Sequence, residues 1–117
     1  MTTGGALFSY GTLQLPAVQQ ANYGRFLDGV ADSLCGYRLI PLKITDESVI
    51  AISGQAIHTI AVPSADPADR ISGTVFELTQ SELETTDAYE VDAYARVEVI
   101  LKSGRSAWIY VGEASAP

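Results

Sequence analysis

Short, largely apolar runs recur along the chain, separated by Gly, Pro, Asp and Ser. Such runs predict β-strands. Apolar and polar residues alternate loosely over Gln55–Val62, and Val97, Val99 and Leu101 share one face of their segment, as expected for strands. The run at 49–52 is apolar but has no clear type, and the polar residues 45–48 before it are expected to form a turn. The expected strands are Ala6–Tyr10, Val30–Leu34, Tyr37–Ile44, Gln55–Val62, Gly73–Leu78, Arg96–Leu101 and Ala107–Val111.

Two segments carry the signals of helices. Pro16 suits a first helical position, and the segment Ala17–Tyr23 predicts a short helix behind it. Thr79 and Glu82 have the spacing of a capping box, which predicts a second helix over Gln80–Tyr89. Hairpins dominate over crossover connections, so we expect an α+β fold. Its mainly antiparallel sheet closes into a small barrel with two short helices.

Composition limits the classes of partner. The 117 residues, with 47% hydrophobic and 18% charged residues, are expected to form one domain over 1–117 with its own core. The net charge of -7 and the seven scattered lysines and arginines argue against duplex nucleic acid and anionic membranes as partners. The chain shows neither a signal peptide nor a long apolar run, so we expect a cytoplasmic location. The sequence leaves the oligomeric state open.

The single cysteine and single histidine do not suggest metal chemistry. They lack the close spacing of zinc ligands, so we expect no metal site, and one cysteine cannot form an internal disulfide. Cys35 has no basic neighbour and is expected to be a small buried hydrophobe rather than a nucleophile. His58 lies in an apolar strand segment. It is either a satisfied packing residue or part of a pocket lining.

The end of the first strand is a candidate binding turn. The strand Ala6–Tyr10 runs directly into Gly11, Thr12 and Leu13. Gly11 can adopt positive φ and lets another group approach the main chain closely. The N–H groups of such a turn suit a carboxylate or a developing oxyanion. The alternative is an N-terminal strand with a tight turn and no binding role.

The end of the second predicted helix carries two carboxylates. Leu83, Asp87 and Glu90 are spaced so that they share one helix face, and apolar Leu83 predicts that this face points toward the core. Burial and the helix C-terminus both raise the pKa of a carboxylate, which suits a general base near neutral pH. Alternatively, Glu90 lies in solvent. Asp87 can instead bond a loop N–H or pair with Arg96.

Five short motifs occur in a fixed order over nearly the whole chain. They are Phe8–Leu13, Gly73–Leu78, Asp87–Glu90, Tyr94–Val97 and Ala107–Val111. Together they resemble the loop, strands and helix end of the γ-glutamylcyclotransferase-like proteins, also called the AIG2-like family. Thr86 stands where that family usually has Leu, and Val91 where it often has Gly. The segment 14–73 matches no motif and is expected to shape the pocket.

The resemblance implies an intramolecular acyl transfer on a small γ-glutamyl substrate. The free α-amine attacks the γ-carbonyl of the same molecule, which gives 5-oxoproline and releases an amine. Glu90 matches the family's general acid/base. Asp87 and Arg96 are expected to support it. The residues expected to bind the substrate are Tyr10, Gly11, Thr12, Leu13 and Tyr94.

No cofactor is implied, because nucleophile and electrophile belong to one molecule and the enzyme mainly orients them. Two other functions remain open at this point. The same fold can serve as a non-catalytic small-molecule-binding or stress-associated module. The same chemistry can also release a different amine, such as that of a γ-glutamyl amide in a secondary-metabolite pathway.

Overall fold

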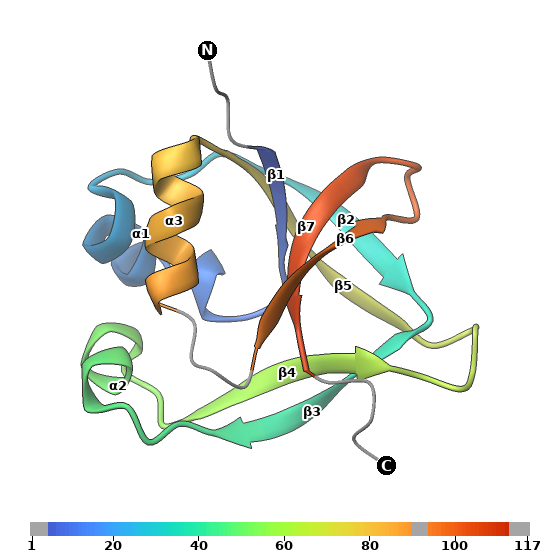
Figure 1. The fold of residues 1–117 in the computed structure, drawn as a ribbon, viewed down its shortest axis with the longest axis horizontal. Coiled ribbons are helices and arrows are strands. Elements are labelled where there is room, and N and C mark those ends of the chain that lie inside the picture. The colour runs from blue at the N-terminus through green and yellow to red at the C-terminus, as the bar shows by residue number, and fades with distance from the viewer. Residues whose placement is uncertain (1–4, 90–93, 113–117) are drawn as a thin grey trace.

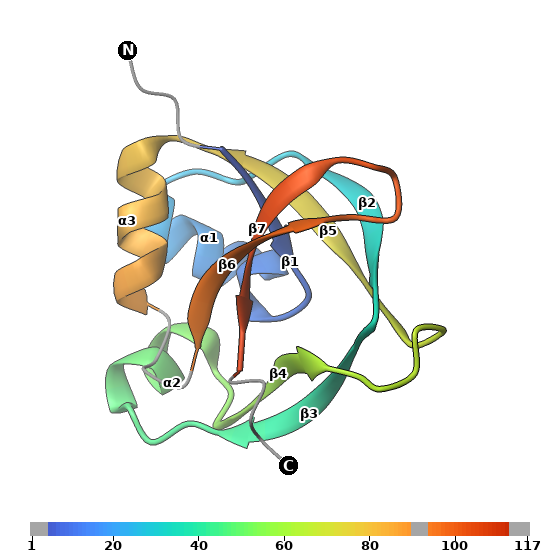
Figure 2. The ribbon, with the colours of Figure 1, turned by 45° about the vertical axis from the view of Figure 1, so that its right-hand side comes forward.

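The computed structural model describes residues 5–89 and 94–112, with the side chain of Leu42 excepted. Within them, one seven-stranded sheet curls into a half-barrel, and helices cover one side of it (Figure 1; Figure 2). The strands are β1 Gly5–Ser9, β2 Gly29–Cys35, β3 Tyr37–Lys43, β4 Ile57–Pro63, β5 Arg70–Leu78, β6 Ala95–Ile100 and β7 Ser106–Val111. The helices are α1 Pro16–Tyr23, α2 Glu47–Ser53, α3 Gln80–Tyr89 and the short 3₁₀ helix η1 Thr12–Gln14.

The sheet is mixed. The strand order is β2-β5-β1-β7-β4-β3, with β6 paired to β7. Four pairings are antiparallel, as the hairpin pattern predicts, but β7 pairs in parallel with both β1 and β4. These two parallel contacts join strands that are far apart in the sequence. Local alternation therefore could not reveal them.

A bent two-stranded ribbon produces the curl. β2 pairs with β5 and β3 pairs with β4, so the chain segment 29–43 runs beside the segment 57–78 over its whole length. Gly36 lies at the bend with φ of 82°, a left-handed conformation that glycine adopts without steric cost. Its N–H donates to the carbonyl of Asp69 at 2.7 Å, and its carbonyl accepts from the N–H of Ser64 at 2.9 Å. The ribbon therefore turns a corner without losing its pairing.

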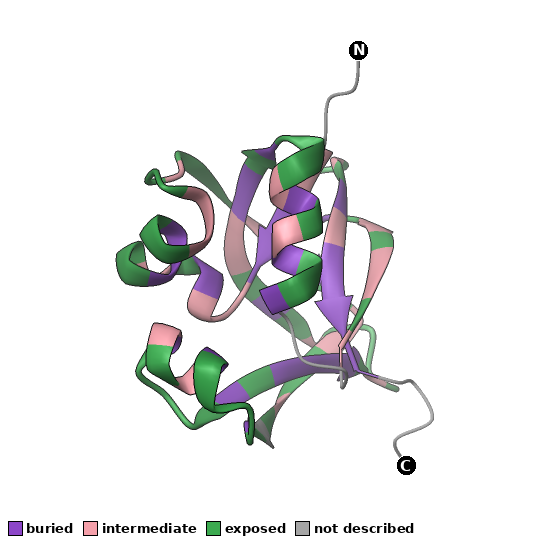
Figure 3. Ribbon diagram, turned by 60° about the vertical axis from the view of Figure 1, so that its left-hand side comes forward, coloured by how far each residue is buried: buried purple, intermediate pink, exposed green. Residues whose placement is uncertain are grey.

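Two apolar clusters lie on opposite faces of this curled sheet. Alternation along β1 sends Leu7 to one face and Phe8 to the other, and both are 1% exposed. On the outer face, Leu7 packs with residues of α1 and α3, such as Val18 and Leu83. On the inner face, Phe8 packs with residues such as Ile109. Figure 3 shows buried residues on the helices as well as along the strands behind them.

The two predicted helices are present, and a third was missed. The capping box of α3 forms as expected: the Glu82 N–H donates to Thr79 Oγ1 at 3.1 Å, and the Thr79 N–H donates to Glu82 Oε1 at 3.0 Å. The run at 49–52, of unassigned type in the sequence, belongs to α2. Asp46 caps α2 by accepting from the N–H of Ser48 at 3.0 Å. An Asp before the run and Gly54 after it were the signals of this helix.

The structure corrects the prediction for Cys35 and shows the environment of Thr86. Cys35 is exposed rather than buried, because it follows buried Leu34 in β2 and strand alternation turns it outward. Thr86, in place of the family's usual Leu, is fully buried. Its Oγ1 lies 2.5 Å from the Tyr23 hydroxyl and 2.7 Å from the carbonyl oxygen of Glu82. Thr86 thus forms a hydrogen-bonded contact between α1 and α3 at a position where the family usually has an apolar side chain.

Within the described ranges, no helix combines the length and the apolar character needed to cross a membrane.

Candidate functional site

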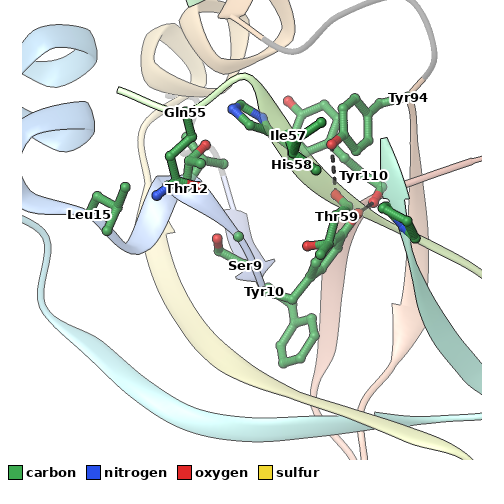
Figure 4. Close-up of a pocket in the computed structure, with 14 residues that line it drawn as sticks. Ser9, Tyr10, Thr12, Leu15, Gln55, Ile57, His58, Thr59, Tyr94 and Tyr110 are labelled. Carbon is green, nitrogen blue, oxygen red and sulfur yellow. Dashed lines mark hydrogen bonds between the residues drawn. The ribbon is translucent and has the colours of Figure 1, made fainter. Parts of the chain in front are cut away.

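A pocket of about 300 Å³ opens where β1 ends. Figure 4 shows that its labelled residues come mainly from two facing segments of the chain. One, here called the turn wall, comprises Phe8–Leu13 and Leu15. The other, here called the β4 wall, comprises Gln55, Ile57, His58 and Thr59. Pro41, Tyr94 and Tyr110 complete the lining among the described residues.

The residues predicted to bind substrate lie together. Tyr10, Gly11, Thr12, Leu13 and Tyr94 all line this pocket, although Tyr94 is some eighty residues from the others in the sequence. Glu90, the predicted catalytic residue, lies outside the described residues.

The end of α3 is fastened to the turn wall. The hydroxyl of Tyr89, the last residue of α3, lies 2.9 Å from Thr12 Oγ1. The Tyr89 side chain is otherwise buried in the outer-face cluster. This contact joins two of the predicted motifs, and it lies at the residue that directly precedes Glu90.

Tyr10 ties three strands together beneath the pocket. Its hydroxyl donates to the carbonyl of Tyr110 at 2.6 Å and accepts from the N–H of Ala61 at 3.0 Å. These bonds join the end of β1 to β7 and β4, whose parallel pairings are short. The Tyr10 ring lines the pocket, whereas its hydroxyl stabilises the sheet.

Gly11 does not use the positive φ that the sequence suggested. Its φ is −135°, so the requirement for glycine here is not a left-handed turn. A Cβ at this position would meet no described atom within 4 Å. The Gln14 N–H donates to the Gly11 carbonyl at 3.1 Å and closes the turn. Gly11 therefore leaves open space beside the pocket.

The predicted pairing of Asp87 with Arg96 is present, but Asp87 does not point into the core. Arg96 donates to Asp87 through Nε at 2.8 Å and Nη2 at 3.0 Å. The Asp87 side chain is 41% exposed, because its position at the edge of α3 leaves one side open to solvent. Asp87 also accepts from the Tyr110 hydroxyl at 2.6 Å. The pair thus holds a pocket-lining tyrosine in place.

His58 is both packed and part of the lining. It is 7% exposed, and its Nε2 lies 3.1 Å from Ser53 Oγ at the end of α2. Burial lowers the pKa of His58 below its ordinary value, and a hydrogen bond with the main chain of Gln55 partly opposes this. The imidazole is therefore neutral at neutral pH.

No cationic side chain faces the pocket. The seven lysines and arginines of the chain all fall within the described ranges, and none of them lines it. Within the same ranges, no three residues of the types His, Cys, Asp and Glu lie close enough together to hold a metal ion. Apart from the residues outside the described ranges, the lining is neutral.

Sequence reasoning missed most of the β4 wall. Gln55, Ile57, Thr59 and Pro41 fall in the segment that matched no motif. The loose alternation over Gln55–Val62 correctly predicted a strand there, but it could not show which part of the chain this strand faces.

Comparison with known proteins shows the family. Residues 7–116 match the family described as gamma-glutamyl cyclotransferase, AIG2-like, and the chain belongs to this family. This agrees with the five motifs and with the fold. A comparison with curated protein sequences finds no match.

Solved structures share the fold. The solution structure of At5g39720.1 from Arabidopsis thaliana is 25% identical, with a TM-score of 0.72, over 97% of this chain and 71% of that one. A gamma-glutamyl cyclotransferase is 16% identical, with a TM-score of 0.72, over 93% of this chain and 66% of that one. The allophanate hydrolase of Kluyveromyces lactis is 14% identical, with a TM-score of 0.70, over 94% of this chain and 17% of that one. The fold therefore also occurs inside a much longer chain.

Proposed function

We propose that the protein cyclises a γ-glutamyl amine or peptide to 5-oxoproline, with Glu90 as the general acid/base. One observation carries the proposal. Tyr89, which precedes Glu90 in the sequence, contacts the turn wall through Thr12, and Tyr94, four residues after Glu90, lines the same pocket. Membership of the gamma-glutamyl cyclotransferase, AIG2-like family supports the reaction type.

The reaction needs no external reactant. The α-ammonium of the γ-glutamyl group gives a proton to Glu90, and the free amine attacks the γ-carbonyl carbon. The new C–N bond closes the five-membered ring while the bond to the leaving nitrogen breaks. The two protons lost by the α-nitrogen end on the departing amine, and Glu90 transfers them. No water is consumed.

The turn wall suits the negative charge of such a substrate. Main-chain N–H groups at the start of a helix have no acceptor inside that helix, and here the turn precedes η1 at the edge of the pocket. N–H groups aimed at a carboxylate or at the oxyanion of a tetrahedral intermediate stabilise it without reorganisation. The pocket then mainly holds the substrate in a reactive conformation.

The test is release of 5-oxoproline. A panel of γ-glutamyl amides and peptides is incubated with the protein, and the product is measured by mass spectrometry. The Glu90→Gln variant should keep the fold and lose about 10²–10⁴-fold in rate, because Gln matches Glu in shape but cannot accept the proton. Glu84→Gln is the matched control, since Glu84 is an exposed residue of α3 that does not line the pocket. Turnover by Glu90→Gln at the normal rate would exclude Glu90 as the base.

A binding role without catalysis is the second candidate. It is favoured by the neutral lining, which can hold a small molecule without any acid or base. In that case the panel would yield ligands with measurable affinity and no 5-oxoproline, and Glu90→Gln would bind them as the unaltered protein does.

A further inference from the structure

We propose that the pocket selects γ-glutamyl compounds whose leaving amine is small, neutral and mainly apolar, and that it discriminates against leaving groups that carry a carboxylate. The proposal rests on the proposed function, because it specifies the leaving group of that cyclisation. It concerns the side of the pocket formed by the β4 wall.

The first argument is the absence of a cation. Every lysine and arginine of the chain is described, and none lines the pocket. Arg96, two residues after Tyr94, already has partners within the protein. It donates two hydrogen bonds to Asp87, and its guanidinium lies 4.5 Å from the centre of the Trp108 ring. A γ-glutamyl substrate brings one α-carboxylate, which the proposed function assigns to main-chain N–H groups of the turn wall. A second carboxylate would lose water without a cationic partner, which is costly.

The second argument is that three hydroxyl groups of the pocket lining already have protein partners. The Tyr94 hydroxyl donates to the carbonyl of Thr59 at 2.8 Å. The Tyr110 hydroxyl donates to Asp87, and the Thr12 hydroxyl bonds that of Tyr89. The rings of Tyr94 and Tyr110 and the methyl group of Thr12 remain as apolar parts of these lining residues. The pocket can therefore accept an apolar group more readily than an anion.

The third argument concerns the size of the cavity and the electrostatic field of the protein. The cavity of about 300 Å³ is at the small end of ligand pockets, which span roughly 300–1,000 Å³. Ile57 and Pro41 place apolar surface opposite the turn wall. The net charge of -7 adds a field that repels a substrate with an extra negative charge. A leaving group that is small, apolar and uncharged fits the cavity volume, the apolar lining and the net negative charge of the protein.

The test uses three substrates that differ at one group. They are γ-glutamyl-leucine, γ-glutamyl-leucinamide and γ-glutamyl-isopentylamide, in which the leucine carboxylate is present, replaced by a neutral amide, or absent. We expect kcat/KM for 5-oxoproline release to be about tenfold or more higher for both neutral compounds than for γ-glutamyl-leucine. Equal or faster turnover of γ-glutamyl-leucine would overturn the proposal.

An added cation should reverse the preference. Gln55 is an exposed residue of the β4 wall, so Gln55→Arg places a guanidinium at the pocket without filling the core. It should raise kcat/KM for γ-glutamyl-leucine relative to γ-glutamyl-leucinamide by about tenfold. Ala56→Arg is the matched control: Ala56 is the next residue, also exposed, but does not line the pocket, and the ratio should stay unchanged. If the ratio of kcat/KM for γ-glutamyl-leucine to kcat/KM for γ-glutamyl-leucinamide is the same in Gln55→Arg and Ala56→Arg, the proposal is wrong.

Failure of the proposed function would be recognised separately. If none of the three compounds gives 5-oxoproline, the cyclisation is wrong, and the selectivity is then judged from binding of the same compounds by calorimetry. Tighter binding of both neutral compounds supports the proposed selectivity. Equal or tighter binding of γ-glutamyl-leucine, or no binding of any compound, overturns it.

Discussion

The turn wall and the β4 wall face each other across one pocket but contribute different chemistry. The turn wall consists largely of consecutive residues, Phe8–Leu13, and the proposed function assigns substrate binding to its main-chain N–H groups. The β4 wall brings side chains to the site: Gln55, the exposed Ile57 and Thr59, and between these two the buried His58, which also contacts Ser53. In our proposals, the turn wall serves the reaction common to the family and the β4 wall selects the leaving amine. The predictions that follow test this division.

The largest expected effect, after loss of Glu90 itself, concerns the contact between α3 and the turn wall. Thr12→Val and Tyr89→Phe each remove one hydroxyl of the 2.9 Å bond. Each should lower kcat/KM by about 10- to 100-fold, because a turn displaced by a fraction of an ångström no longer aligns the reacting groups. The kcat/KM of the double variant should be no lower than that of either single variant, since all three variants lack the same hydrogen bond.

Thr85→Val is the control for this pair. Thr85 lies in α3, and its hydroxyl donates to the carbonyl of Ser81 at 3.1 Å. Like Thr12 it has a hydrogen-bonded hydroxyl, but it does not line the pocket. Its kcat/KM should be unaltered. Fully additive losses from Thr12→Val and Tyr89→Phe would show that the two hydroxyls act independently and that the turn wall does not depend on α3.

A smaller effect is expected from the β4 wall. Ile57 is 55% exposed, so its replacement should cost little stability. Ile57→Trp should lower kcat/KM for bulky neutral amines relative to small ones by about tenfold, and Ile57→Ala should do the opposite. Ile100, which is 64% exposed on β6 and does not line the pocket, is the control for Ile57→Ala. A uniform loss for all amines would mean that the β4 wall takes part in the reaction rather than in selection.

The smallest effect is on stability and depends on pH. His58 has a folded-state pKa below the value of about 6.5 that it has in an unfolded chain. As pH falls through 6.5, the unfolded state takes up a proton that the folded state resists, so the free energy of unfolding decreases. The slope is at most about 1.4 kcal/mol per pH unit and ends below the folded-state pKa.

His58→Gln should remove this slope while keeping a group that can bond Ser53 Oγ. Because His58 is the single histidine of the chain, the difference between the two proteins in urea unfolding at pH 7.5, 6.5 and 5.5 isolates its contribution. Parallel stability curves for the two proteins would show that the burial of His58 does not depress its pKa.

Several features of the fold were predictable because local forces decide them. The α3 cap depends on two residues three positions apart, and both of its hydrogen bonds form. The strands could be located because short apolar runs and the turn residues that bound them are local patterns. By contrast, α2 was missed although Asp46 and Gly54 marked its ends, because its apolar run is too short for a helical period to be evident. The resemblance correctly identified the family. Tyr10, Gly11, Thr12 and Leu13, which it implied would hold the substrate, line the pocket, and their binding role stays a prediction.

The amino-acid sequence by itself determined the strands, two of the three α-helices, the turn after β1 and the motifs of the family. These depend on neighbours within a few positions of one another. Only the tertiary structure decided that β7 lies in parallel between β1 and β4, that Asp87 holds Tyr110 as well as Arg96, and that the β4 wall faces the turn wall. One of them depends on the bend at Gly36, beyond which β3 and β4 continue and β4 reaches β7 and the pocket. The local sequence of either wall does not indicate which distant strand packs against it, because such packing depends on residues far away in the chain.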